Sequence, residues 1–350
     1  MDIAGPRSHR PKNSAQGVNY IYIPDTLAQW PWPRAINAHY EECKAASESW
    51  IHGFNVFSPE DQAAFDSCNF SLLASLAYPN LDKEGCLLGC YLMNLFFVFD
   101  QKTDVSNEHE TRYLAGCIMD ALRHPHKPRP PGEWVGGLIA QRFWQEAIKI
   151  VTPPCQRRFI QYFDRYTEAV IQQSSDRTEG RVHDIDSFTK LRRETIGTLP
   201  SFALLEIRFN IPDHVMEHPT IQRLTDLCTD LISIGNDLYS YNVEQARGDE
   251  SHNLVTVTMT TLDCILQEAY NQIGMLHDAL AAEFLDLRNN IPSFPEESEA
   301  VNRAIREYVD GLGNWVRANE CWSFEGGRYF GCDGVRILKD RTVALTPKNV

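Results

Sequence analysis

A strongly apolar run ends in two aspartates at Leu95-Phe96-Phe97-Val98-Phe99-Asp100-Gln101-Lys102-Thr103-Asp104. The apolar residues from Glu84 to Phe99 recur with helical spacing. Asp100 and Asp104 stand four positions apart, so a helix places both on the same face. Like charges at that spacing destabilise a helix slightly, which favours either a solvated helix end or a bound cation. We therefore predict a long buried helix with two carboxylates at its carboxyl end.

The same helical period recurs along the chain between prolines, which mark the ends of long helices because a proline inside one costs ~3 kcal/mol. The periodic segments are His39–Phe54, Arg112–Leu122, Trp134–Ile150, Gln156–Gln173, Ile221–Gln245, Leu262–Leu287 and Ser298–Ala318. Alternating strand patterns and a composition shift between domains are both missing from the sequence. We predict an all-α fold of about ten to twelve helices in a single domain over residues 20–350, after a disordered tail over residues 1–19.

Composition excludes several classes of protein. The chain has 350 residues with 33 Lys+Arg against 47 Asp+Glu, and its net charge of −14 disfavours nucleic-acid binding. Hydrophobic residues make up 43%, which is enough to bury a large core. The longest apolar run, Leu92–Phe99, is far shorter than the ~20 residues that span a bilayer, and Met1–Gly17 lacks the apolar centre of a secretory signal. We expect a cytoplasmic protein without a membrane span.

A second polar stripe lies in the segment after Gly235. Asn236, Ser240 and Glu244 recur every four residues and continue the apolar line of this helix, so they face the core. Amide, hydroxyl and carboxylate oxygens without sulfur or imidazole suit a hard cation such as Mg²⁺. Near the carboxyl end, Gly326-Gly327-Arg328-Tyr329 predicts a flexible loop that can bring a cation and a phenol over a site, although a surface tail is the alternative.

Motifs of other enzyme classes are missing from the sequence. It contains no GxxxxGK[ST], GxSxG or HExxH pattern and no GxGxxG after a strand. None of the 11 histidines follows a glutamate by three positions, which excludes the ligand pattern of ferritin-like di-iron bundles.

Taken together and in this order, the three polar segments resemble the class I terpene synthases, and most of all the sesquiterpene synthases of mushroom-forming fungi, the protoilludene synthases among them. The resemblance runs from about Pro24 to Pro347. It includes the family's text at Pro24-Asp25-Thr26-Leu27-Ala28, at Trp30-Pro31-Trp32-Pro33-Arg34, at residues 72–79 and at residues 311–319. It implies a helical bundle around a central cavity.

The resemblance also implies roles for individual residues. Asp100 and Asp104 would open and close the aspartate-rich metal motif, and Asn236, Ser240 and Glu244 would form the second one. Together they would hold three Mg²⁺ ions, for which Mn²⁺ can substitute. The remaining roles would be Arg192 as diphosphate sensor with Arg193 as its rival, Ile196 as effector through its backbone, Arg328 and Tyr329 as diphosphate contacts, and Phe96 as a cavity wall. Gln101 and Val243 depart from the family, which has an acid and a lysine there.

The activity implied by the resemblance is ionisation and cyclisation of farnesyl diphosphate, with 1,11-closure to a humulyl-derived skeleton such as protoilludene. An acyclic alcohol such as nerolidol and a 1,10-closed cadalane remain alternative products. A chain-elongating prenyl diphosphate synthase is the rival enzyme, although that class has a second aspartate-rich motif in place of Asn236, Ser240 and Glu244. A non-catalytic helical scaffold is the rival outside enzymes. The substrate is the expected partner, and the chain is expected to be a monomer or a homodimer.

Overall fold

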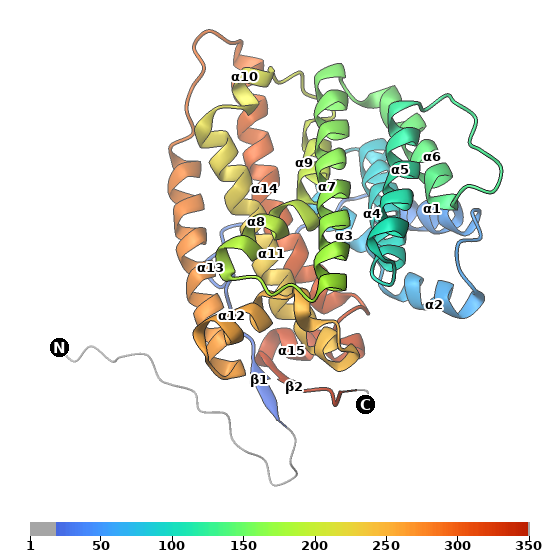
Figure 1. The fold of residues 1–350 in the computed structure, drawn as a ribbon. Helices are drawn as coiled ribbons and strands as arrows, with labels where there is room; N and C mark the ends of the chain where they lie inside the picture. The colour runs from blue at the N-terminus through green and yellow to red at the C-terminus, as the bar shows by residue number, and fades with distance from the viewer. Residues whose placement is uncertain (1–18, 349–350) are drawn as a thin grey trace.

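A computed structural model describes residues 19–348, and almost every element in it is a helix (Figure 1). The elements in chain order are β1 (Tyr20–Tyr22), α1 (Tyr40–His52), α2 (Pro59–Ser67), α3 (Phe70–Ala77), α4 (Lys83–Thr103), α5 (Glu108–Arg123), α6 (Val135–Ile150), α7 (Pro153–Glu179), α8 (Ile185–Thr195), α9 (Thr198–Ala203), α10 (Asp213–Met216), α11 (Pro219–Arg247), α12 (Leu254–Leu262), α13 (Leu266–Asn289), α14 (Glu299–Glu325), α15 (Gly334–Asp340) and β2 (Thr342–Ala344). Twelve of these helices, α1–α8 and α11–α14, have eight or more residues, which confirms the predicted all-α fold. None of the described helices is both long and apolar enough to cross a membrane.

Helix α4 runs through the interior because its apolar residues face neighbours on most sides. It packs against α1, α3 and α6. Asp82 caps its amino end by accepting a hydrogen bond from the Gly85 backbone N–H at 3.1 Å. Leu95 and Phe99, one turn apart, are fully buried, and each such side chain stabilises the fold by about 1.5–3 kcal/mol. The helix therefore holds its last turn, where Asp100 lies, in a fixed place.

Helix α11 is the second long central helix, and it packs against α13 and α14. Pro219 occupies its first turn, where the missing N–H costs no hydrogen bond. Its carboxyl end is closed by Gly248 with a φ of 84°, a conformation that glycine adopts without strain. Leu224, Leu227 and Leu231 bury one side of the helix, and the polar stripe lies farther along the chain.

The predicted helix over Leu262–Leu287 is wrong at its beginning. The structure ends α12 at Leu262 and starts α13 at Leu266. Asp263 lies between them with a φ of 48°, in the left-handed region, and this reverses the direction of the chain.

The two ends of the described chain meet in an antiparallel ribbon that the sequence patterns did not indicate. β1 pairs with β2 so that Ile21 lies opposite Val343. Most of the predicted tail, residues 1–18, lies outside the described residues, whereas Asn19 accepts a hydrogen bond from the Leu345 N–H at 2.8 Å. The ribbon brings the amino-terminal segment against the carboxyl-terminal helices (Figure 1).

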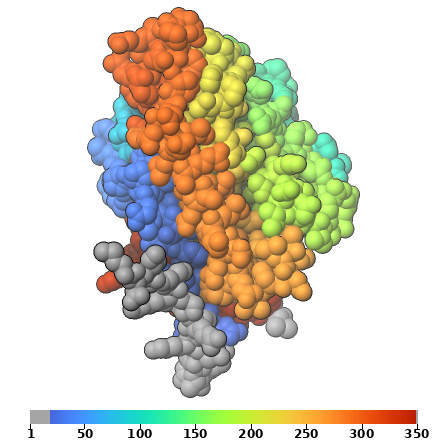
Figure 2. Space-filling model, turned by 90° about the vertical axis from the view of Figure 1, so that its left-hand side faces the viewer, coloured from blue at the N-terminus to red at the C-terminus, as the bar shows by residue number. Residues whose placement is uncertain are grey.

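A partly buried arginine, Arg317, and a buried one, Arg341, fasten that amino-terminal segment to α14. Arg317 donates hydrogen bonds to the carbonyl oxygens of Trp32 at 2.9 Å and Leu27 at 2.9 Å. Arg341 bridges Asp25 at 2.7 Å and the buried Glu320 at 3.0 Å. Figure 2 shows the same segment, in blue, lying beside α13, in orange. The packing there is tight, since a Cβ on Gly274 of α13 would lie 2.9 Å from Pro24.

Candidate functional site

Asp100 and Asp104 lie at the carboxyl end of α4, as predicted. Asp100 belongs to the last turn, and Asp104 is the residue that ends the helix. Asp104 is exposed at the surface, but desolvation by the surrounding chain, and then the charge of Asp100, raise its pKa to about 8. Burial also raises the pKa of Asp100, against the opposing charges of Arg328 and Arg192. Two carboxylates that resist ionisation side by side are a suitable place for a cation.

Arg328 and Tyr329 connect this carboxylate pair to the polar stripe on α11. A guanidinium nitrogen of Arg328 lies 3.5 Å from the Asp100 carboxylate, and its carbon Cζ lies 4.8 Å from the centre of the Phe97 ring. The hydroxyl of Tyr329 accepts a hydrogen bond of 2.9 Å from the Asn236 amide. Asp100 keeps 42% of its side-chain surface exposed, so solvent weakens its pair with Arg328. Neighbouring residues of one loop thus contact both motifs.

The stripe on α11 is present as predicted and lies largely inside the fold. Ser240 is 1% exposed, while Asn236 and Glu244 are partly buried. Burial, followed by the charge of Asp237, raises the pKa of Glu244 to about 6, although hydrogen bonds from Ser240 and Asn253 oppose the shift. Among the described residues, Arg192 supplies the positive charge that acts on Glu244, and it is the smallest of the five influences on the pKa of this carboxylate.

Arg192, on α8, joins the same cluster. It donates a hydrogen bond of 2.8 Å to the side-chain oxygen of Asn236, and two of its nitrogens lie 2.8 and 3.1 Å from one oxygen of Asp237. Asp237 is 1% exposed, so it needs this cation to remain ionised inside the fold.

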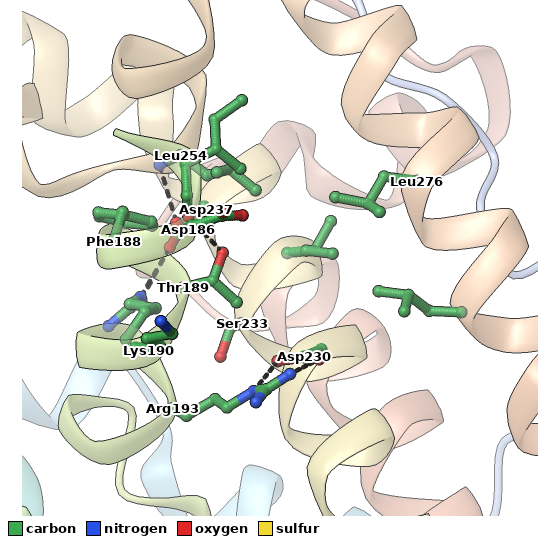
Figure 3. A pocket seen from close by; sticks show the side chains of 14 residues that line it. Asp186, Phe188, Thr189, Lys190, Arg193, Asp230, Ser233, Asp237, Leu254 and Leu276 are labelled. Carbon is green, nitrogen blue, oxygen red and sulfur yellow. Dashed lines mark hydrogen bonds and ion pairs between the residues drawn. The ribbon is translucent and has the colours of Figure 1, made fainter. Parts of the chain in front are cut away.

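Arg193 is not brought to the cluster. Its guanidinium forms a two-pronged ion pair with Asp230, with both bonds 2.7 Å long. The pair borders a cavity of about 440 Å³ between α8, α11 and α13. Figure 3 shows the Arg193 side chain pointing to Asp230, whereas Leu276 lies on the opposite wall of the cavity. Neither Asp100 nor Arg328 lines this cavity. Arg192 and Asp237 border the same cavity, so the two rival arginines differ in their ion-pair partners and not in the cavity they face.

Ile196 lies where α8 breaks into α9. Its backbone N–H still bonds to the Arg192 carbonyl at 3.0 Å, but the next residue, Gly197, has a φ of 75° and interrupts the helix. A Cβ on Gly197 would lie 3.3 Å from the Phe96 ring. The structure therefore places the helix break, one residue after Ile196, close to the predicted wall residue Phe96.

Phe96 is 7% exposed and belongs to an aromatic group on the α4 side of that break. Its ring stacks on Phe163 with centroids 5.3 Å apart and meets Tyr166 edge-on at 5.1 Å. Such pairs contribute about 0.5–1.5 kcal/mol beyond area burial. One turn of α4 therefore separates an aromatic surface from the carboxylate of Asp100.

Three further residues contact the cluster, and the sequence patterns did not single them out. Asp237 holds Arg192, Asn253 contacts Ser240 and Glu244, and Arg177 donates to the Thr103 carbonyl at 2.8 Å beside Asp104. Asp237 directly follows a stripe residue, and an Asn before an apolar run is a helix-cap signal. Those two signals could have marked Asp237 and Asn253, whereas Arg177 has none.

The donor set fits a hard divalent cation. It consists only of carboxylate, amide and hydroxyl oxygens, which Mg²⁺ and related ions prefer. Within residues 19–348, no three His, Cys, Asp or Glu side chains form a metal-binding group by themselves. A cation here would therefore need the side-chain oxygens of Asn236 and Ser240 as well as the carboxylates. It would also need oxygens from a bound small molecule.

A profile of terpene synthase family 2, described as C-terminal metal binding, matches residues 91–283. The chain belongs to the terpene synthase family. A Delta(6)-protoilludene synthase of Stereum hirsutum is 50% identical over 93% of this chain and 88% of the relative. One of Armillaria gallica is 46% identical over 94% of this chain and 95% of the relative. The solved a-eudesmol synthase superposes with a TM-score of 0.76 at 22% identity, over 84% of this chain and 97% of that one, which supports the fold.

Family membership makes this chain a terpene cyclase that uses a divalent metal and a prenyl diphosphate. The matched residues 91–283 contain Asp100, Asp104 and the stripe on α11, but they end before Arg328 and Tyr329. Arg328 and Tyr329 lie outside the matched region, and it is the folded structure that brings them to Asp100 and Asn236.

Proposed function

We propose that this terpene synthase ionises farnesyl diphosphate and closes C1 onto C11, forming a protoilludene-type sesquiterpene with release of diphosphate. The observation that carries the proposal is the 46–50% identity, over nearly the whole chain, to relatives named Delta(6)-protoilludene synthase. The convergence of Arg192, Arg328 and Tyr329 on two groups of oxygen donors supports it.

We assign the donors to two groups around the diphosphate. Asp100 and Asp104 would hold metal at the end of α4, and Asn236, Ser240 and Glu244 would hold it on α11. Mg²⁺, with three ions as our proposal, would supply positive charge that stabilises the departing diphosphate. Carboxylates with raised pKa values gain most from such a partner, because the cation favours their ionised form.

Arg192, Arg328 and Tyr329 would bind the diphosphate oxygens directly. Their present partners are side chains of the two donor groups, so a diphosphate between these groups lies within their reach. As the C1–O bond breaks, its electron pair stays on the diphosphate oxygen, and fixed guanidinium groups stabilise that charge without reorganising. The allyl cation left behind keeps fifteen carbons and loses a proton only after ring closure.

Phe96 would form part of the wall that contacts the cation. The face of an aromatic ring attracts a cation but does not attack it, so it can guide a reactive carbon without quenching it. The backbone of Ile196, at the break after α8, is our candidate for the element that transmits diphosphate binding to this wall, since a Cβ on the next residue, Gly197, would lie 3.3 Å from the Phe96 ring.

Incubation of the purified chain with farnesyl diphosphate and Mg²⁺, followed by gas chromatography–mass spectrometry, tests the proposal. We expect a tricyclic hydrocarbon and an equal amount of diphosphate, and neither in EDTA. A longer prenyl diphosphate would instead assign a chain-elongating enzyme. A 1,10-closed product or nerolidol would overturn the 1,11-closure only. Absence of diphosphate release with C10, C15 and C20 substrates would indicate a non-catalytic scaffold.

A further inference from the structure

We infer that Asn253 is a positioning residue that holds Glu244 and Ser240 in the conformation that receives metal. The inference rests on the proposed function, because it concerns the same metal-binding stripe. Asn253 lies just before α12, nine positions after Glu244, and is fully buried. It belongs to neither predicted metal motif.

The side-chain amide of Asn253 donates to three oxygens of α11. Its nitrogen Nδ2 lies 2.8 Å from a carboxylate oxygen of Glu244, 2.9 Å from the Asp237 carbonyl and 3.4 Å from the Ser240 hydroxyl. The first two are strong contacts, and the third is long. Hydrogen bonds to a charged acceptor contribute roughly 1.5–3 kcal/mol, so the contact with Glu244 carries most of the effect.

The orientation of this amide is fixed by its other end. The oxygen Oδ1 of Asn253 accepts a hydrogen bond of 2.8 Å from the Val255 backbone N–H and thereby caps α12. A flipped amide would place its oxygen against the Asp237 carbonyl and the Glu244 carboxylate, which are both acceptors. The nitrogen must therefore face the metal motif, and the start of α12 anchors it.

Geometry explains why Glu244 needs such an anchor. Residues four apart drift by about 40° around an α-helix, so Glu244 starts about 80° away from the direction of Asn236. Its longer side chain can reach a common ion, but it has more rotamers to lose than Asn236 or Ser240. A buried donor that holds one carboxylate oxygen restricts these rotamers before metal binds and so reduces that entropic cost.

Serine at position 253 separates the two tasks of the residue. Ser is as good a helix cap as Asn, but its short side chain cannot reach Glu244. Asn302→Ser is a matched control. Asn302 also pins a loop through both ends of its amide, to the N–H of Phe294 at 2.8 Å and its carbonyl at 2.9 Å. Asn302 lies near the start of α14, 23 residues before Glu325, which ends the helix just before the loop of Arg328 and Tyr329. This separation is about 35 Å along the helix.

The experiment measures thermal stabilisation of the full chain by Mg²⁺ with inorganic pyrophosphate, and farnesyl diphosphate turnover across the same Mg²⁺ range. We expect Asn253→Ser to raise the Mg²⁺ midpoint of both curves by about 10–100-fold, as is typical when a partner of a metal ligand is removed. Turnover at saturating Mg²⁺ recovers to within a few-fold of wild type. Asn302→Ser leaves both midpoints unchanged. Asn253→Thr, which is closer to Asn in volume, provides the same test if the serine variant misfolds.

Two results overturn the inference. A folded Asn253 variant with an unchanged Mg²⁺ midpoint shows that the residue only caps α12. A lower maximal turnover at an unchanged midpoint has the same meaning. Failure of the proposed function looks different, because wild type itself would then show neither pyrophosphate-dependent stabilisation nor turnover, and the inference would fall with it.

Discussion

A guanidinium nitrogen of Arg192 lies 2.8 Å from the side-chain oxygen of Asn236, the atom through which an asparagine binds metal. Arg192 therefore supplies a positive charge to the second donor group before any metal binds there. Arg193, the next residue on α8, pairs instead with Asp230, although both arginines border the same cavity. Variants of these two adjacent arginines can therefore be compared, because Arg192 contacts the second donor group and Arg193 pairs with Asp230 instead.

We expect Arg192→Lys to lower kcat/KM for farnesyl diphosphate by at least 100-fold. Lysine keeps the charge that the buried Asp237 needs, but it lacks the fork that contacts Asn236 and Asp237 together. The melting temperature should change little for the same reason. Arg193→Lys is the control, with kcat/KM within a few-fold of wild type. Equal losses in both variants would remove the distinction between the two arginines.

Asp100→Asn is expected to abolish diphosphate release without unfolding the chain. The side chain is 42% exposed and its contact with Arg328 is long at 3.5 Å, so little stability depends on its charge. Loss of one of two neighbouring carboxylates also relieves repulsion with Asp104. Pyrophosphate release and the melting temperature are measured together. Turnover near the wild-type rate would contradict the role of Asp100 as a metal ligand.

Acid sensitivity of the fold is expected to depend on His277 of α13. Burial lowers the pKa of His277 to about 3, and its Nδ1 has no hydrogen-bond partner within the described chain. The unfolded chain binds a proton on this histidine below its ordinary pKa of about 6.5, and the folded chain does not. Stability is therefore present above pH 6.5 and falls as the pH drops toward 3, by about 1.4 kcal/mol per pH unit.

Urea unfolding at pH 7, 6 and 5 measures this contribution in wild type and His277→Leu. The free energy of unfolding of the variant should fall less steeply with acidification. His109→Leu, at an exposed position, should follow the wild-type slope. Parallel slopes for wild type and His277→Leu would mean that His277 is protonated inside the fold.

The central helices could be predicted from the sequence because their own residues determine them. The apolar period of α4 and α11 reports burial directly, and a four-residue spacing is enough to place Asp100 with Asp104 and Asn236 with Ser240 on one face. The break before α13 could not be predicted because it depends on Asp263 in a left-handed backbone conformation. Glycine is the residue that usually adopts this conformation, and the sequence has none there.

Contacts between distant segments could not be predicted in this way. The ribbon pairs Ile21 with Val343, and no local pattern of three-residue strands reports a partner so far along the chain. The same holds for Asn253 and Arg177, whose contacts with the site exist only after α11, α12 and α7 have packed. Local periodicity thus predicted the two faces that we propose bind metal, whereas the residues that support them could be found only in the folded structure.

Product choice is expected to depend on Phe96, which stacks on Phe163 with ring planes 5° apart. A Cβ on Gly197, at the helix break, would lie 3.3 Å from the Phe96 ring, and Phe163 is 0% exposed. Phe96→Ala removes an aromatic face beside the first cation and admits water, so we expect more acyclic alcohol and 1,10-closed product. A difference of about 1.4 kcal/mol between competing transition states changes their ratio tenfold, so the shift is readily measured by gas chromatography–mass spectrometry. Phe163→Ala has a similar cost in stability, about 3–5 kcal/mol, and should leave the product ratio nearer to wild type. An unchanged product ratio in Phe96→Ala would show that the Phe96 ring packs the core and does not line the substrate cavity. Both variants would then differ from wild type in stability alone.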